Sequence, residues 1–287
     1  MKIIYDLPAE QYHRAAGVSN SMLKRMDPTP AHFKASMAEP FETTPAMIMG
    51  TLTHAMVLEP DKPLPKVALV PDAYIDAKGV EKPWTFASNT CKDWRKAQEA
   101  EGLLILTATQ RQSVIGMVAS IAAHPVAKKI IAAAATEVSL YARNPKFDAL
   151  FGEDNPLLKC RLDIAPMGNF LADVKTCEDA GDDFSKTIFT FGYYMQAAFY
   201  IDLWNILHPH DPKSHFVFIA VEKSPPYAVR VVRLSQRCIQ AGRGTYLQRL
   251  TRYVECTRSG QWPGYSTEIE EVDIPAWAHA SLERKAS

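Results

Sequence analysis

Apolar residues in the first 60 positions recur every three to four residues, a spacing typical of helices. Prolines divide this stretch into several short helices. Ser19 can cap one of them, which should stop at Asp27-Pro28. A longer apolar helix is expected from Pro45 to Leu58. The N-terminal part, residues 1–60, is therefore predicted to be helical.

The regular spacing of apolar residues is weak in residues 61–100 and returns in residues 107–135. Residues 61–100 show little periodicity, and we expect loops there with one short strand at Val67 to Val70. Residues 107–135 are rich in alanine and predict a helix with an interruption near His124-Pro125.

From residue 137 onward, short runs with alternating side chains predict strands. Two of them are joined by the turn Met167-Gly168-Asn169. We expect strands at 137–142, 158–165, 170–175, 216–221 and 228–234, and helices at 184–207 with a break at Gly192, at 236–258 and from 275 onward. A mixed β-sheet flanked by helices is the simplest architecture for this order of elements.

The two strands beside the turn carry acidic side chains where a buried strand would be apolar. Side chains alternate between the faces of a strand. In the first strand Asp163 should therefore lie opposite Leu162 and Ile164, and in the second Asp173 and Lys175 should share a face. If the turn pairs these strands, it brings two carboxylates and an ammonium to one surface.

Two carboxylates a few ångströms apart raise each other's pKa unless a cation lies between them. A divalent ion supplies that charge, and Mg²⁺ prefers carboxylate oxygens and water. Lys175 could then orient or deprotonate a water molecule, or stabilise developing negative charge. This chemistry is that of metal-dependent phosphodiester hydrolysis. A hairpin with a solvated polar face would show the same pattern.

Four other residues favour metal-dependent hydrolysis over a solvated hairpin. They do so through their order along the chain and not individually. His54 follows Gly50 on the apolar helix, Glu137 opens a strand, and Gln196 and Tyr200 lie four apart on one helix face. Each alone is typical of an ordinary core or surface residue. Together they give the order G-x3-H, E, D, D-x-K, Q-x3-Y.

This ordered set resembles the RecB-type branch of the PD-(D/E)xK nuclease superfamily. It resembles more closely the C-terminal nuclease domain of RecE-type exonucleases (exodeoxyribonuclease VIII), which are common in phages and prophages. The resemblance covers about residues 5–222 and is carried by segments 17–35, 47–60, 158–166, 170–180 and 191–202. It implies a restriction-endonuclease-like α/β (α+β) fold in a single domain, residues 1–287, with the catalytic sheet and helix at 137–234 and C-terminal helices at 236–287.

The resemblance also implies roles for individual residues. Asp163 and Asp173 would be metal ligands, with the Val174 carbonyl as a third. His54 would be a further ligand or would position a water, and Glu137 would help hold a second metal or its waters. The ion would be Mg²⁺, with Mn²⁺ able to substitute. The catalytic lysine would be Lys175, and Gln196 and Tyr200 would position the scissile strand. A more distant similarity to lambda-type exonucleases implies that Arg14 and Ser21 hold a 5′-phosphate. Arg161, which flanks Asp163, is a further candidate DNA contact.

Composition restricts the partners and the compartment. Lys plus Arg and Asp plus Glu each number 32, so a uniformly basic coat for nucleic acid is excluded, although a local basic channel is not. The five cysteines include no C-x-x-C pair, which favours reduced thiols over a zinc or iron–sulfur site. Asp6 and Glu10 interrupt any signal-peptide core, and we expect a cytoplasmic protein that does not enter a membrane.

The expected function is a Mg²⁺-dependent double-strand DNA exonuclease. The resemblance alone implies 5′ to 3′ polarity, 3′ single-stranded tails for phage-type recombination, a homo-oligomeric ring around DNA with free ends, and a single-strand annealing protein as partner. Two alternatives remain open. One is an endonuclease or single-strand nuclease of the same superfamily, and the other is an inactive DNA-binding module.

Overall fold

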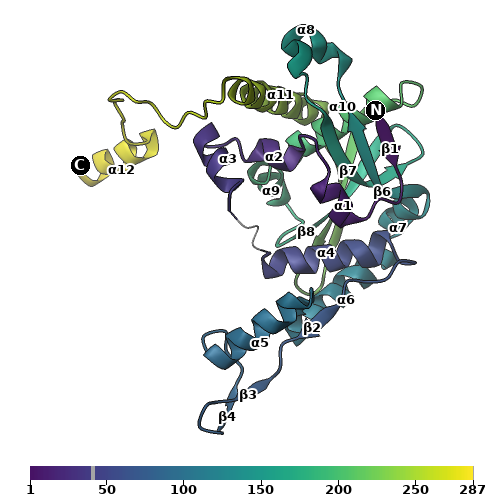
Figure 1. Cartoon of the computed structure of the whole chain (residues 1–287), viewed down its shortest axis with the longest axis vertical. Helices are drawn as coiled ribbons and strands as arrows, with labels where there is room; N and C mark the ends of the chain where they lie inside the picture. Colours follow the sequence, from purple (N-terminus) through teal and green to yellow (C-terminus); the bar gives the residue numbers. More distant parts are fainter. Residues whose placement is uncertain (40–42, 287) are drawn as a thin grey trace.

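Six strands form one mixed sheet in the order β1-β6-β7-β8-β9-β10 (Figure 1). The computed structural model describes residues 1–39 and 43–286, so 40–42 and 287, which belong to the predicted N-terminal and C-terminal helical parts, lie outside the described residues. The strands are β1 (Lys2–Ile4), β6 (Ala134–Ala142), β7 (Leu158–Pro166), β8 (Phe170–Cys177), β9 (His215–Glu222) and β10 (Val229–Arg233). Only β8 and β9 are parallel neighbours; the other pairs are antiparallel. The predicted mixed sheet is confirmed.

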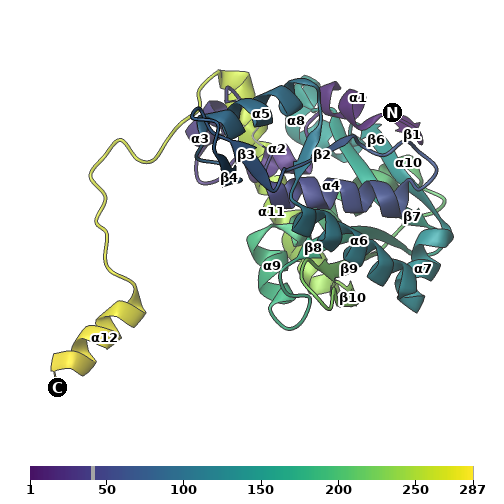
Figure 2. The same cartoon turned by 90° about the horizontal axis from the view of Figure 1, so that it is seen from below.

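Helices cover both faces of this sheet and divide the core in two (Figure 2). One face packs against α10 (Tyr193–Leu207), α11 (Gln236–Ser259), α2 (Asn20–Lys24) and α9 (Phe184–Thr190). The other packs against α4 (Pro45–Leu58), α6 (Ala108–Ala123) and α7 (Pro125–Ala132). The alternation of β9 shows the division, because Phe216 and Phe218 face the first layer while Val217 and Ile219 face the second.

The helix starts follow the expected capping chemistry. The Ser19 hydroxyl accepts a hydrogen bond from the Met22 amide at 3.3 Å at the start of α2. Thr44 caps α4 in the same way, with Pro45 as its first residue. The remaining N-terminal helices are α1 (Ala9–Arg14) and α3 (Pro30–Ser36). The predicted helical N-terminal part is present, but the edge strand β1 was not predicted.

The contact between α10 and α11 leaves no space for a side chain at Gly242. A Cβ atom built there would lie 2.0 Å from the Tyr194 carbonyl oxygen. Gly244, two residues later, has nothing within 4 Å of the same point. The first glycine therefore lets the two helix backbones approach closely, and the second lies on the open side of α11.

Residues 61–106 form an arm that extends from the body beyond α4 (Figure 1). It contains β2 (Val67–Leu69), which pairs with β5 (Leu104–Leu106), and a small ribbon of β3 (Ala73–Ile75) and β4 (Glu81–Pro83). It also contains the helix α5 (Asn89–Ala100), so the prediction of loops over 61–100 was wrong there. This helix buries only Cys91 among its twelve residues, and a mostly polar helix has little apolar periodicity to reveal it.

The remaining elements lie at the periphery. A short helical segment follows β6, with η1 (Pro145–Phe147), α8 (Asp148–Phe151) and η2 (Gly152–Asp154). Beyond α11 the chain extends away from the body to α12 (Ala276–Ala286), as both views show (Figures 1 and 2). Among the described helices, no single one is long and apolar enough to span a membrane, and only α6 and α7 taken together across an 85° bend pass that test.

Candidate active site

In strands β6 and β7 the apolar side chains switch from one side of the sheet to the other. The switch occurs at one position, where Glu137 of β6 lies opposite Asp163 of β7. The ladder pairs Val138 with Leu162 and Thr136 with Ile164, but it skips the rung between them. Leu162 packs in the α10–α11 layer, whereas Ile164 packs in the α4–α6 layer. The prediction that Leu162 and Ile164 share a face is therefore wrong.

The cause lies in the backbone of β6. Glu137 has a φ of 54°, in the left-handed region that non-glycine residues rarely adopt. A residue in that conformation interrupts the pleat, so alternation with period two restarts out of phase beyond it. The interruption leaves Glu137 and Asp163 at the change of face, where their carboxyl groups lie close to His54 of α4.

His54, Glu137 and Asp163 each place one ligand atom within 4.8 Å of the other two. The Asp163 Oδ2 atom accepts a hydrogen bond from the Val174 amide at 2.9 Å. It also lies 3.4 Å from His54 Nδ1. All three side chains keep some contact with solvent, so a small ion can reach them. Three of the five predicted metal ligands thus converge.

The second nitrogen of His54 decides how its ring is protonated. Nε2 lies 2.9 Å from the Val174 carbonyl oxygen, which can only accept a hydrogen bond, so Nε2 must donate. Burial lowers the pKa of His54, which leaves the ring neutral near pH 7. The Nδ1 lone pair therefore faces the Asp163 carboxylate. Two electron-rich atoms in this position call for a proton or a metal ion between them.

The carboxyl groups show the same shortage of positive charge. Burial, and then the nearby charge of Asp163, raises the pKa of Glu137 to about 7. Burial and the charge of Asp173 raise the pKa of Asp163 far above that of an ordinary carboxyl group. A site with two such carboxyl groups and an imidazole lone pair fits a divalent ion with oxygen and nitrogen ligands. The donor set does not distinguish Mg²⁺ from Mn²⁺.

Asp173 lies beside this cluster and has a different arrangement of partners. Its side chain is 1% exposed, and its Oδ2 atom lies 2.6 Å from Lys175 Nζ. Gln196 Nε2 donates to its Oδ1 atom at 2.5 Å, as the Q-x3-Y order led us to expect for a residue near the site. The ligand role predicted for Asp173 remains a prediction, since its charge is compensated by Lys175.

Lys175 remains a cation in this environment. Burial alone would lower its pKa, but the negative charges of Asp173 and Asp163 raise it above the ordinary lysine value. Its Nζ atom also lies 4.7 Å from the centre of the Tyr193 ring. The sequence pattern did not indicate Tyr193, although it comes three residues before Gln196 and one α-helical turn places the two near each other.

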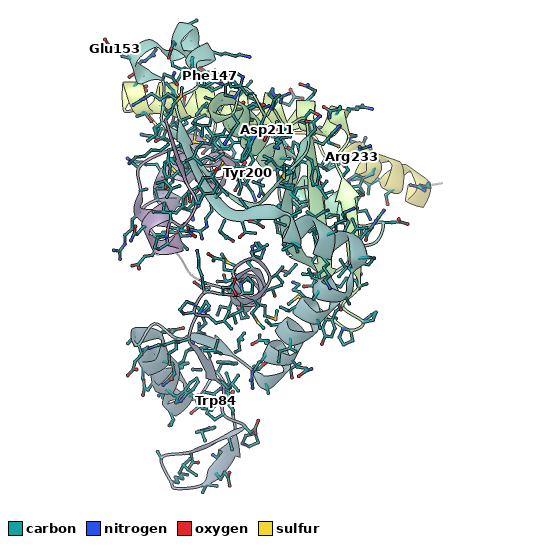
Figure 3. All side chains as sticks on the ribbon, turned by 90° about the vertical axis from the view of Figure 1, so that its right-hand side faces the viewer. Trp84, Phe147, Glu153, Tyr200, Asp211 and Arg233 are labelled. Atoms are coloured by element: carbon teal, nitrogen blue, oxygen red, sulfur yellow. The ribbon has the colours of Figure 1, made fainter. Side chains whose placement is uncertain are left out.

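Tyr200 lies one turn after Gln196 on α10, and Figure 3 shows it against the sheet. Its ring packs edge-on to Phe216, with 6.3 Å between the ring centres. Burial raises its pKa well above the ordinary tyrosine value, so the hydroxyl remains protonated. The structure thus places Tyr200 behind the carboxylates, and its predicted role with the scissile strand is untested.

The three candidate DNA contacts lie in different places. Arg161 is 12% exposed and donates hydrogen bonds to the Glu137 carboxylate and to the Leu7 carbonyl oxygen. It therefore holds Glu137 in position. Arg14 is 79% exposed and pairs with Glu10 at 2.6 Å, and Ser21 is exposed on α2. No described contact joins these two residues to the carboxylates, so their phosphate-binding role stays a prediction.

Comparison with known proteins gives one family match and a few structural neighbours. The family described as a PDDEXK-like domain of unknown function (DUF3799) matches residues 19–275. A crystal structure from Eubacterium rectale, named "Putative exonuclease", has a TM-score of 0.61 at 12% identity and covers 96% of this chain and 98% of its own. At that identity the likeness shows the fold alone.

A second solved structure, SSO0001, covers 79% of this chain and 84% of its own at 10% identity. Its TM-score of 0.29 is too low to support an argument. No curated protein matches the sequence.

Proposed function

The chain belongs to the PDDEXK-like family DUF3799, and from this premise we propose that it is a metal-dependent nuclease acting on DNA. One observation carries the proposal. An imidazole lone pair and two carboxyl groups of raised pKa converge within 4.8 Å, and a buried lysine–aspartate pair lies next to them. Among the described residues the cluster has one ion-pair partner, Arg161 on Glu137, so the His54 lone pair and the Asp163 carboxyl group face each other without a cation between them.

The residues of the site divide into two groups in this proposal. His54, Glu137 and Asp163 hold the ion, and Asp173 and the Val174 carbonyl adjoin it as further ligands. A divalent ion bound there would lower the pKa of a bound water and polarise the phosphate. Arg161 positions Glu137 through its guanidinium group.

The other group acts on the substrate. Lys175 keeps its positive charge beside the acids and stabilises the negative charge that develops on the phosphate. Gln196 donates to the Asp173 carboxylate, and Gln196 and Tyr200, one turn apart on α10, would position the scissile strand.

We further propose that the enzyme is an exonuclease on double-stranded DNA with free ends, degrading 5′ to 3′ with Mg²⁺ as the natural ion. The resemblance carried by the order of the five motifs supports this part, and the name of the Eubacterium rectale protein, "Putative exonuclease", agrees with the exonuclease activity only. A homo-oligomeric ring, a single-strand annealing partner and a role in phage-type recombination belong to the same proposal.

A time course with linear duplex labelled at either the 5′ or the 3′ end tests this function, in EDTA, Mg²⁺ and Mn²⁺. Label should be released from the 5′ end first, only with metal, and Asp163→Asn should abolish release. Asp61→Asn, an exposed acid on the arm, is the matched control and should remain active. Cleavage of a closed circular duplex would identify an endonuclease instead. If no label is released with either metal, the nuclease proposal is wrong.

A further inference from the structure

The junction of α9 and α10 carries two phenylalanine rings on the surface. Phe189 is 74% exposed and Phe191 is 53% exposed. Exposed apolar side chains are common singly, but those that lie close together next to a polar site can mark a binding surface. Gly192, with a φ of 63°, makes the sharp turn between the two helices and keeps the rings outside the core.

Each exposed ring is held by a tyrosine of α10. Phe191 stacks on Tyr193 with 5.8 Å between ring centres and 21° between planes. Phe189 stacks on Tyr194 at 6.0 Å and 12°. The outer faces of the phenylalanines are thus flat and preoriented, as a surface for stacking another planar group requires.

This aromatic corner, Phe189 and Phe191 with their tyrosines, is continuous with the candidate active site. The Tyr193 ring that supports Phe191 also lies 4.7 Å from Lys175 Nζ. Lys175 in turn pairs with Asp173 at 2.6 Å. Phe191 and Lys175 therefore contact the same tyrosine ring, that of Tyr193.

Lys24 adds an unmatched positive charge to the same place. Its aliphatic chain lies against Gly192, where a Cβ atom would meet it at 3.6 Å. Among the described residues it has no hydrogen bond or ion pair with a carboxylate. Burial, followed by the charges of Lys175 and Arg249, lowers its pKa. Lys175 and Arg249 are paired with Asp173 and Asp27, so Lys24 is the cation of this group that a phosphate could pair with.

We propose that the aromatic corner is a stacking site for unpaired nucleobases of the substrate strand, with Lys24 bound to a phosphate of that strand. This inference rests on the proposed nuclease function and names the part of the DNA that the site would recognise. Aromatic rings beside a basic group are the combination that proteins use to hold single strands without sequence preference.

Fluorescence of 2-aminopurine tests the stacking directly. The probe is a duplex with two unpaired 2-aminopurine nucleotides at one end, titrated in Ca²⁺ buffer so that binding is read independently of turnover. Binding should quench the probe with the unaltered chain and with Phe191→Trp. Phe191→Ala should lose the quenching and weaken binding by roughly 5- to 100-fold, the range for one lost base stack. Phe86→Ala, an exposed ring on the arm, is the matched control and should bind normally.

The salt dependence of binding tests Lys24. Lys24→Ala should lower the slope of log affinity against log salt by about 0.7, as expected for one lost phosphate contact to a single strand. Lys78→Ala, an exposed lysine of the arm, should leave the slope unchanged.

The outcomes separate this inference from the proposed function. If the unaltered chain cleaves DNA but Phe191→Ala keeps both quenching and affinity, the stacking site is wrong and the nuclease stands. If quenching depends on Phe191 but no metal supports cleavage, the stacking site stands and the nuclease proposal fails. If Phe191→Ala changes only the oligomeric mass, the rings contact another protein chain and the inference is wrong. Absence of any DNA binding overturns both.

Discussion

Lys175 and Asp173 illustrate how a buried charge is tolerated. Taking a carboxylate out of water is costly, and the lysine offsets that cost because its Nζ atom lies 2.6 Å away. The neighbouring set of His54, Glu137 and Asp163 has no comparable cation except Arg161, which contacts Glu137. One charge pair is complete within the protein, whereas the other cluster sets two carboxyl groups and an imidazole beside a single ion-pair partner, Arg161.

Lys175→Ala should therefore have two separable effects. Turnover should fall about 100- to 1000-fold, the usual effect of losing one electrostatic contact to a transition state, while metal binding is retained. The free energy of unfolding should fall by up to about 3 kcal/mol, because Asp173 loses its partner. Denaturant unfolding and single-turnover cleavage measure these effects.

The double variant Asp173→Asn with Lys175→Met is the control for that pair. Removing both charges should recover much of the lost stability and none of the activity. Activity near that of the unaltered chain in Lys175→Ala would show that the lysine has no part in the chemistry.

The raised pKa of Glu137 and Asp163 predicts opposite pH effects with and without metal. A carboxyl group whose pKa is higher folded than unfolded binds extra protons in the folded state, so stability falls as pH rises from the ordinary range near 4 through about 7. A metal ion needs the deprotonated groups, so its stabilising effect should grow over the same interval.

Thermal unfolding at pH 6 and pH 8, with and without Mn²⁺, checks this expectation. The metal-free chain should melt lower at pH 8, and the shift caused by Mn²⁺ should be larger there. Asp163→Asn should show no shift at either pH. An equal Mn²⁺ shift at both values would mean that protons and metal do not compete at this site.

The sequence predicted which residues belong to the site better than it predicted which of them contact one another. Asp163, Asp173 and Lys175 could be found because a charged residue inside an apolar strand is conspicuous. Asp173 contacts Lys175, whereas Asp163 faces His54. These contacts depend on distances that the spacing of residues along the sequence does not contain. The pairing of Arg161 with Glu137 could not be predicted because the two residues are 24 positions apart, and the role of Arg161 as a DNA contact stays a prediction.

The change of face at Glu137 and Asp163 belongs to the strands rather than to the side chains. Sequence patterns assume that a strand keeps its pleat, so they predict one face for Leu162 and Ile164. A single left-handed residue on the neighbouring strand breaks that assumption. The elements that the sequence missed have related causes. β1 is three residues long and is defined by its pairing with residues 139–141, and α5 is mostly polar.

The packing of α10 on α11 makes a prediction at two glycines of one helix. Gly242→Ala should destabilise the protein by about 1–3 kcal/mol, because the new methyl group overlaps the Tyr194 carbonyl oxygen. Gly244→Ala should stabilise it by up to about 1 kcal/mol, since alanine favours an exposed helical position. Chemical denaturation of both variants measures the difference, and effects of the same sign would contradict this account of the interface.

The order of elements along the chain was sufficient to predict a mixed sheet between helices, and that prediction holds. It holds because five of the six strands and the helices between them are long enough to show their periodicity. The arm and α12 could not be placed from the sequence, since their positions depend on few buried residues. Their exposed side chains, among them Val80 and Phe86 on the arm and Trp277 on α12, cover little of the core.

The proposed ring predicts a mass in solution that is a multiple of 32.0 kDa. Light scattering after size exclusion at micromolar concentration should give that multiple, and a single 32.0 kDa species would contradict the ring.

Deletion of residues 276–287 should leave the thermal midpoint unchanged, because α12 lies apart from the sheet (Figures 1 and 2). If the deletion also halves or further lowers the mass, the tail takes part in assembly.

The unpaired position between β6 and β7 has a consequence for transferring the cluster of His54, Glu137 and Asp163 to another protein by design. Copying His54, Glu137 and Asp163 onto a regular helix and sheet would not reproduce the cluster, because in an unbroken pleat Glu137 and Asp163 would simply share one face and would not lie at a change of face. A working graft must first install the left-handed residue at position 137 and the matching gap on its neighbour. The backbone defect, and not the choice of acids, is the part of this centre that must be designed before anything else.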